Sequence, residues 1–211
     1  MMMKLSIRPL LVGIALLPGL LAGAQQKNAL TTFTEKVATN KASFSYKFSA
    51  GAHMNGSGSA AVQGDCFTLK LSSFEMTCNG STMWTVDRDS KEVIIEPVDS
   101  PEAAGAFNPA LLIGSIGQAF NIKSEAQTNV NGKPAIRYTL VPKVSSIDIR
   151  ELVVTIASDA SAMYSMKATV KDGTVTDITI PNFSFGPKAS AAEFTIKDSS
   201  FGRDYIITDL R

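Results

Sequence analysis

The sequence predicts a mainly β protein with some helix: an α+β fold in which a strongly curved antiparallel sheet, or incomplete β-barrel, carries helices on its concave face. The first observation is that apolar and polar residues alternate in many short segments separated by turn residues, as in half-buried strands. The second is that only two stretches carry apolar residues at helical spacing. We therefore expect a large sheet, with the few helices covering one of its faces.

The first helical stretch spans residues 29–41. Its apolar residues Leu30, Phe33 and Val37 recur at helical spacing, and Thr31 or Thr32 is a suitable cap. We expect a short amphipathic helix here, before the first strand.

A first run of strands follows this helix. Turn residues such as Gly64-Asp65, Ser72-Ser73 and Asn79-Gly80 separate its alternating segments. Residues 50–59 are rich in Gly, Ser and Asn, so we expect a hairpin loop there, with His53 a solvated loop residue. The strands expected in this run are residues 43–48, 67–71, 74–78, 84–86 and 93–95.

A helical insert, residues 101–120, interrupts the strands. Asn108 before Pro109 forms a typical helix start, and an apolar stripe follows it. We expect the insert to act as a lid on the sheet. Asp172-Gly173 marks a hairpin in the second run of strands. The strands expected in this run are residues 135–141, 152–156, 163–170, 175–185 and 193–196.

Residues 1–24 have the features of a secretory signal peptide. Lys4 and Arg8 precede an apolar run that ends in the small triplet Ala22-Gly23-Ala24. No cysteine follows the expected cleavage site, so nothing marks the mature chain for lipid attachment. We expect residues 25–211 to form a single exported domain that works in the periplasm.

Composition and motifs exclude several classes of function. The 20 basic and 19 acidic residues nearly cancel, which disfavours a nucleic-acid partner. Two cysteines and one histidine show no metal-ligand spacing, so no metal site is expected. No nucleophile, base or carboxylate pair forms a recognisable cluster, as an extracytoplasmic hydrolase would require. We expect no catalytic residues, no cofactor and no enzymatic activity.

Two demands conflict at the cysteines. A two-residue turn at Ser72-Ser73 sets Leu69 opposite Met76 and Phe67 opposite Cys78, which leaves Cys66 on the other face. An oxidising compartment nevertheless favours a Cys66–Cys78 disulfide. Both demands are met only if a bulge changes the register.

The most distinctive feature is an excess of large apolar and soft side chains on single strand faces. They form either an ordinary core or a cavity for an acyl chain, covered by the helical insert. The strand positions assigned to a lipid-binding cavity are Phe44, Tyr46, Phe48, Phe67, Leu69 and Met76, and the lid positions are Leu112, Ile116 and Phe120.

Two short motifs carry a family resemblance. Residues 79–87, with Lys91-Glu92-Val93, resemble the DGKTxWxYxxxxxEV run of periplasmic outer-membrane lipoprotein carriers, the LolA-like family, in its Bacteroidetes-type branch. The ending Ile206–Arg211 resembles that family's VIDLR, and the insert and later strands follow the family's order. Trp84 is a landmark of the first motif, and we expect it in the structural core.

The resemblance implies a carrier that shelters the acyl chains of lipoproteins and moves them from the inner to the outer membrane. The implied partners are acylated lipoproteins, an inner-membrane ABC lipoprotein exporter and an outer-membrane acceptor, with the carrier itself a monomer. A lipid-sensing envelope stress regulator or scaffold on the same fold is the alternative. One departure concerns the family's RPNxF segment: residues 52–58 read AHMNGSG, so its arginine has no counterpart here.

Overall fold

A computed structural model of the chain describes residues 27–51, 54–98 and 108–211. The expected signal peptide (1–24), His53 and residues 101–107 of the expected lid lie outside these ranges. Within them, no helix has both the length and the apolar character needed to cross a membrane.

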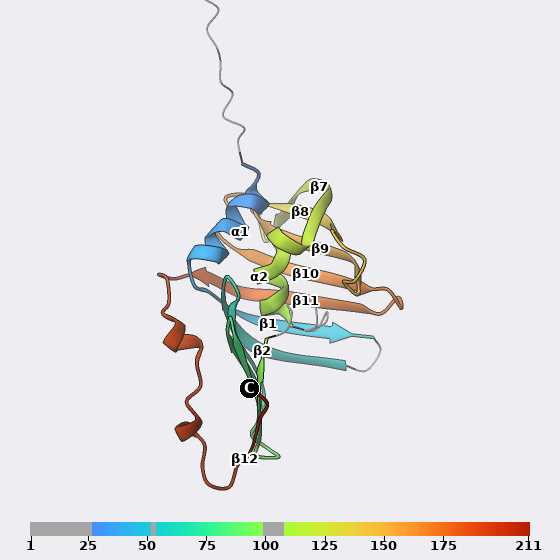
Figure 1. Cartoon of the computed structure of the whole chain (residues 1–211). Coiled ribbons are helices and arrows are strands. Elements are labelled where there is room, and N and C mark those ends of the chain that lie inside the picture. The colour runs from blue at the N-terminus through green and yellow to red at the C-terminus, as the bar shows by residue number, and fades with distance from the viewer. Residues whose placement is uncertain (1–26, 52–53, 99–107) are drawn as a thin grey trace, which may run out of the picture.

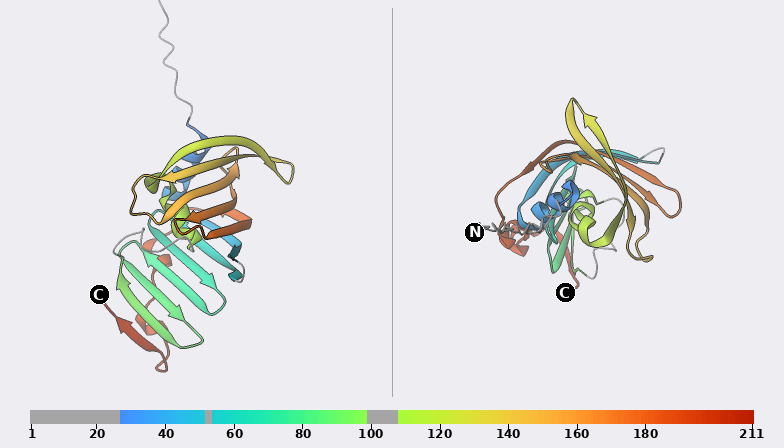
Figure 2. Two further views of the ribbon diagram at one scale, coloured as in Figure 1. Left: turned by 90° about the vertical axis from the view of Figure 1, so that its right-hand side faces the viewer. Right: turned by 90° about the horizontal axis from the view of Figure 1, so that it is seen from above.

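The strands of these described ranges join one open sheet of twelve, in the order β12-β6-β5-β4-β3-β2-β1-β11-β10-β9-β8-β7. Neighbouring strands are antiparallel except β12 and β6, which are parallel. The expected curved sheet with helices against its concave face is confirmed (Figures 1 and 2). The strands are β1 (Ala42–Ala50), β2 (Met54–Gln63), β3 (Cys66–Leu71), β4 (Phe74–Asn79), β5 (Thr82–Asp87), β6 (Glu92–Pro97), β7 (Phe120–Val130), β8 (Lys133–Pro142), β9 (Ile149–Ala157), β10 (Met163–Val170), β11 (Val175–Phe185) and β12 (Ile206–Asp209).

Helices α1 (Ala29–Thr39) and α2 (Pro109–Ala119) both pack inside the curve of the sheet. We call the sheet surface that they contact the helix-side face. Asn108 caps α2 as expected, accepting hydrogen bonds from the next two free backbone N–H groups. The expected cap of α1 is wrong: the Asn28 side chain, not Thr31 or Thr32, occupies the cap position and accepts the Thr31 N–H at 2.8 Å.

The expected hairpin loop at residues 50–59 is wrong. Most of these residues belong to strand β2. Tyr46 pairs with Gly58 and Phe48 with Gly56 across the β1–β2 ladder. A side-chain carbon at Gly56 would lie 2.7 Å from the Phe48 ring. The glycines therefore leave room for aromatic rings from β1, a role that glycine plays inside strands as well as in loops.

Three further elements differ from expectation. Strand β7 was missed because nearly all of its side chains are exposed, so it shows no apolar alternation. The edge strand β12 was not predicted as a strand, because its residues were noted only as part of the motif Ile206–Arg211. Residues 193–196, expected as a strand, instead lie partly in the 3₁₀ helix η2 (Ala191–Phe194), which a Ser190–Glu193 capping box starts.

The sheet carries two separate hydrophobic cores. The larger lies on the helix-side face, where α1 and α2 cover the middle and upper strands. The smaller lies on the opposite face of β5 and β6, where Trp84, Val86, Val93 and Ile95 are all buried. Residues 186–205, which include the 3₁₀ helix η3 (Asp198–Ser200), run along that face before the chain joins the sheet as β12, and we call them the C-terminal strap. Trp84 is thus structural core, as expected.

The register at the cysteines follows the apolar side chains. Leu69 pairs with Met76 and Phe67 with Cys78, as the two-residue turn predicted. Cys66 pairs with Asn79, so Cys66 and Cys78 lie on opposite faces, and both are free thiols. The expected disulfide is therefore not formed in this structure, because no bulge shifts the β3–β4 ladder.

We predict that Gly58→Ala lowers the free energy of unfolding by about 1 to 3 kcal/mol, as overpacking does in other cores. A methyl group at Gly58 would collide with the Lys70 carbonyl oxygen and the Tyr46 ring. Urea denaturation followed by Trp84 fluorescence measures the change. In Gly186→Ala the new methyl lies 3.8 Å from its nearest neighbour, so this control should be neutral. Equal effects of the two substitutions would contradict the packing argument.

Candidate functional site

The structure brings the nine residues assigned to a cavity together on the helix-side face. Eight of them are buried members of the larger core, and Met76 is partly buried against it. Phe120 belongs to the first position of β7, at the end of α2, and not to the helix itself. The assignment therefore found one continuous apolar surface. Which of these residues contact a ligand stays a prediction.

Most of this surface is filled by the helices. Phe33 from α1 lies against Phe183, with ring centroids 5.5 Å apart, and Phe44 stacks on Phe183 at 5.8 Å. Ile113 and Ile116 of α2 are fully buried in the same core. An acyl chain could enter this region only by displacing helix side chains.

Strands β4, β5, β6 and β12 extend beyond the two helices (Figure 2, left). On β4, β5 and β6 most strap-side residues are buried, whereas the helix-side residues other than Cys78 are half-buried or exposed. All four residues of β12 are exposed. Ile94 is 41% exposed and Ile206 is 65% exposed. We call this region the open apolar face. Its apolar residues, identified from the strand register, are Phe74, Met76, Met83, Ile94, Ile206 and Leu210. The register places Thr85, Asp87, Glu92, Glu96 and Thr208 on the same face.

Two methionines lie where the open apolar face meets the closed core. Met76 and Met83 are both partly buried against core residues. Methionine side chains are flexible and polarisable, so they adapt to apolar ligands of different shape. The sequence analysis assigned Met76 and missed Met83 and Ile94. Alternation of apolar and polar residues separates the two faces of each strand, but it does not show which face lies on the side of the helices.

Two tyrosines, Tyr46 and Tyr138, place hydroxyl groups inside the apolar core, and Tyr46 is the one among the nine assigned residues. The Tyr46 side chain is 2% exposed, and its hydroxyl has no hydrogen-bond partner among the described residues. Burial raises the pKa of Tyr46 to about 12, because the ionised form is costly away from water. The hydroxyl therefore stays protonated and is available to donate to a carbonyl group.

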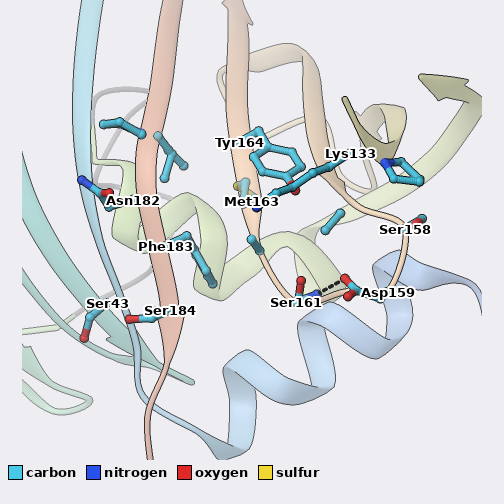
Figure 3. Close-up of a pocket in the computed structure, with 15 residues that line it drawn as sticks. Ser43, Lys133, Ser158, Asp159, Ser161, Met163, Tyr164, Asn182, Phe183 and Ser184 are labelled. Atoms are coloured by element: carbon cyan, nitrogen blue, oxygen red, sulfur yellow. Dashed lines mark hydrogen bonds between the residues drawn. The ribbon is translucent and has the colours of Figure 1, made fainter. Parts of the chain in front are cut away.

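A second concavity lies where β10 and β11 diverge (Figure 3). Its volume is about 1010 Å³, and none of the nine assigned residues lines it. The last β10–β11 pair joins Ser165 and Thr179, so beyond it β11 pairs with β1 on one side and has no strand partner on the other among the described residues. The groove is bordered by Asn182, Lys133 and several serines, with Met163 and Phe183 at its base. Its mixed polar lining distinguishes it from the open apolar face.

Several charged groups form ion pairs on the surface. Glu75, on the strap side of β4, lies 2.6 Å from Arg88 and 3.3 Å from Lys70, measured from carboxylate oxygen to nitrogen. Glu75 is 9% exposed, and its two cations account for its burial. Among the described residues, no three His, Cys, Asp or Glu side chains are close enough to hold a metal ion.

Comparison with known proteins places the fold. No protein-family model matches the chain, and no curated protein matches its sequence. An uncharacterized conserved protein from Thermus thermophilus matches in structure with a TM-score of 0.55 at 9% identity, over 85% of this chain and 96% of that one. The two share a fold. At this identity the likeness says nothing of activity.

Two other solved structures match less closely. MucB has a TM-score of 0.48 at 11% identity, over 81% of this chain and 62% of MucB. The LolA superfamily protein NE2245 from Nitrosomonas europaea has a TM-score of 0.39 at 9% identity, over 85% of this chain and 100% of that one. A LolA superfamily protein is thus among the solved structures that match the chain. The Bacteroidetes-type branch stays a prediction.

We predict that the free energy of unfolding falls between pH 10 and pH 12 by on the order of 2 kcal/mol through Tyr46. In this range the unfolded chain has lost the tyrosine proton that the folded protein keeps, so rising pH favours unfolding. Tyr46→Phe should remove this part of the pH dependence. At neutral pH it should cost little stability, because the hydroxyl has no partner to lose. Urea titrations at several pH values test this, and an unchanged slope in Tyr46→Phe would contradict it.

Proposed function

We propose that the mature chain is a periplasmic carrier that shelters lipoprotein acyl chains on its helix-side face and moves them from the inner to the outer membrane. The observation that carries the proposal is the open apolar face, which leaves apolar side chains in contact with water beside a closed core. An exposed apolar surface of this kind favours binding of an apolar ligand such as an acyl chain.

The physical requirements of a carrier agree with this geometry. Burying one CH₂ group is worth roughly 0.8 kcal/mol, so a fully enclosed long acyl chain would be held too tightly to be released. An acyl chain lying on the open apolar face would stay partly exposed. Its affinity would then be intermediate, and displacement of α2 would allow further burial.

The Tyr46 hydroxyl adds a polar contact to the proposal. An acyl chain carries an ester or amide carbonyl at its head, and a protonated hydroxyl can donate to such a group. Because the hydroxyl lies deep among apolar side chains, this contact would form only after the helices move. We therefore assign Tyr46 to the loaded state of the carrier.

The implied partners follow from this role. They are acylated lipoproteins as cargo, an inner-membrane ABC lipoprotein exporter as donor and an outer-membrane acceptor. The expected signal peptide supports export to the periplasm. No cofactor and no catalytic step is part of the proposal.

We predict that Met83→Asp combined with Ile94→Asp reduces lipoprotein release by about tenfold or more, because two carboxylates would have to be desolvated against the acyl chain. The assay incubates the mature chain with spheroplasts and quantifies triacylated lipoprotein in the soluble fraction. Thr179→Asp is the control, since Thr179 is exposed on the other face of the sheet, paired with Lys47. Circular dichroism of each variant verifies folding.

Release as a one-to-one complex by the native chain, lost in the double variant, would support the carrier role. If the native chain releases nothing while a known carrier does so from the same spheroplasts, the carrier role is wrong. Lipid binding without release would then favour the lipid-sensing regulator.

A further inference from the structure

Strand β12 forms one edge of the sheet, and half of its backbone groups point away from the protein. The N–H groups of Ile206 and Leu210 donate to the carbonyls of Lys91 and Ile95 on and beside β6, at 2.9 and 2.8 Å. Backbone groups alternate sides along a strand. Those of Ile207 and Asp209 therefore point to the open edge, where they can pair with another strand.

The two edges of the sheet differ in protection. Strand β7, at the other edge, carries Lys123 and Glu125 and has a register shift between Ile122 and Ser124. Charges and bulges of this kind discourage pairing between sheets. Strand β12 has no lysine, proline or bulge, and its one charged residue, Asp209, forms an ion pair with Arg211. Ile206, Ile207 and Leu210 are 65%, 43% and 59% exposed. A mostly apolar edge with so little protection is a pairing site for another strand.

We propose that β12 pairs antiparallel with β12 of a second copy of this chain, around a two-fold axis through Thr208. In this register Ile207 lies opposite Asp209 of the second copy. These are the residues whose backbone groups point outward, so they form the hydrogen-bonded pairs. Thr208 lies opposite Thr208 of the second copy in a non-hydrogen-bonded pair, where side chains approach most closely.

The side chains fit this symmetry. Ile206, Thr208 and Leu210 lie on one face, so Ile206 of each copy packs on Leu210 of the other, with Thr208 between them. The pattern reads the same in both directions, as an isologous interface requires. It argues for a second copy over an unrelated strand. The proposed dimer departs from the monomer expected from the sequence.

The dimer also extends the open apolar face. Ile206 and Leu210 belong to that face, so pairing would join the open apolar faces of both copies across the axis. A four-residue strand offers a small interface, and small interfaces are weak. We expect a reversible dimer that dissociates on dilution. The inference rests on β12 alone and does not depend on the carrier role.

Cysteine cross-linking tests the register. Thr208→Cys, made in a Cys66→Ser background, would place two thiols directly opposite each other, within disulfide range. Ile207→Cys is the matched control, because the two cysteines would be offset by two residues and lie more than about 7 Å apart. We expect Thr208→Cys to form disulfide-linked dimers at least about tenfold faster than Ile207→Cys under mild oxidation. Cross-linking of Ile207→Cys at an equal or greater rate would overturn the proposal.

Sedimentation of the native chain provides an independent test. We expect its average mass to rise toward that of a dimer as concentration increases. Ile207→Pro should abolish this rise, because it removes an outward N–H while leaving the bonds from Ile206 and Leu210 to β6. A native chain that stays monomeric at every concentration, or an Ile207→Pro variant that dimerises like the native chain, would overturn the proposal.

Discussion

The structure depends on a mismatch between a wide sheet and two short helices. Twelve strands spaced about 4.8 Å apart extend over roughly 50 Å along the curve of the sheet. Each helix has 11 residues, which gives a length of about 16 Å and a width of about 10 Å. Two such helices cover only part of one face. The remaining strands must bury their apolar residues elsewhere or leave them exposed.

The chain does both. On β5 and β6 the C-terminal strap buries Trp84 and its neighbours on one face. No helix of the described residues covers the other face of these strands, where Met83 is partly exposed and Ile94 is exposed. Asp87, Glu92 and Glu96 lie on this face too, as expected of a surface in contact with water. Met76, Met83 and Ile94 lie among them, and the two methionines also pack against the larger core. The ligand proposal rests on these apolar side chains, and their contact with the core gives a ligand a path inward.

Sequence reasoning succeeded where one face of an element is buried. Alternation gave the β3–β4 register, with Leu69 opposite Met76, and helical spacing gave Leu30, Phe33 and Val37 as the buried face of α1. It failed at β2, where Gly56 and Gly58 are small because the aromatic rings of β1 lie across them. No single segment carries the signal for such a pair, since the two residues are partners only across the ladder.

The site itself was only partly predictable for a related reason. Periodicity separates the two faces of each strand, and the assigned residues do share one face. It does not tell which strands the helices reach, because that depends on how far two helices extend across a curved sheet. Met76 and Met83 have similar surroundings, yet only the first was assigned. The disulfide expectation failed because compartment chemistry gives no information on strand register.

Photo-crosslinking tests the central claim, that acyl chains bind to the open apolar face, most directly. A lipopeptide carrying a diazirine near the end of one acyl chain would be bound to the mature chain, irradiated and mapped by mass spectrometry. The account predicts adducts concentrated on the helix-side residues of β4, β5 and β6, with Met76, Met83 and Ile94 foremost. Adducts confined to the strap side, to the groove between β10 and β11, or spread without preference would contradict it.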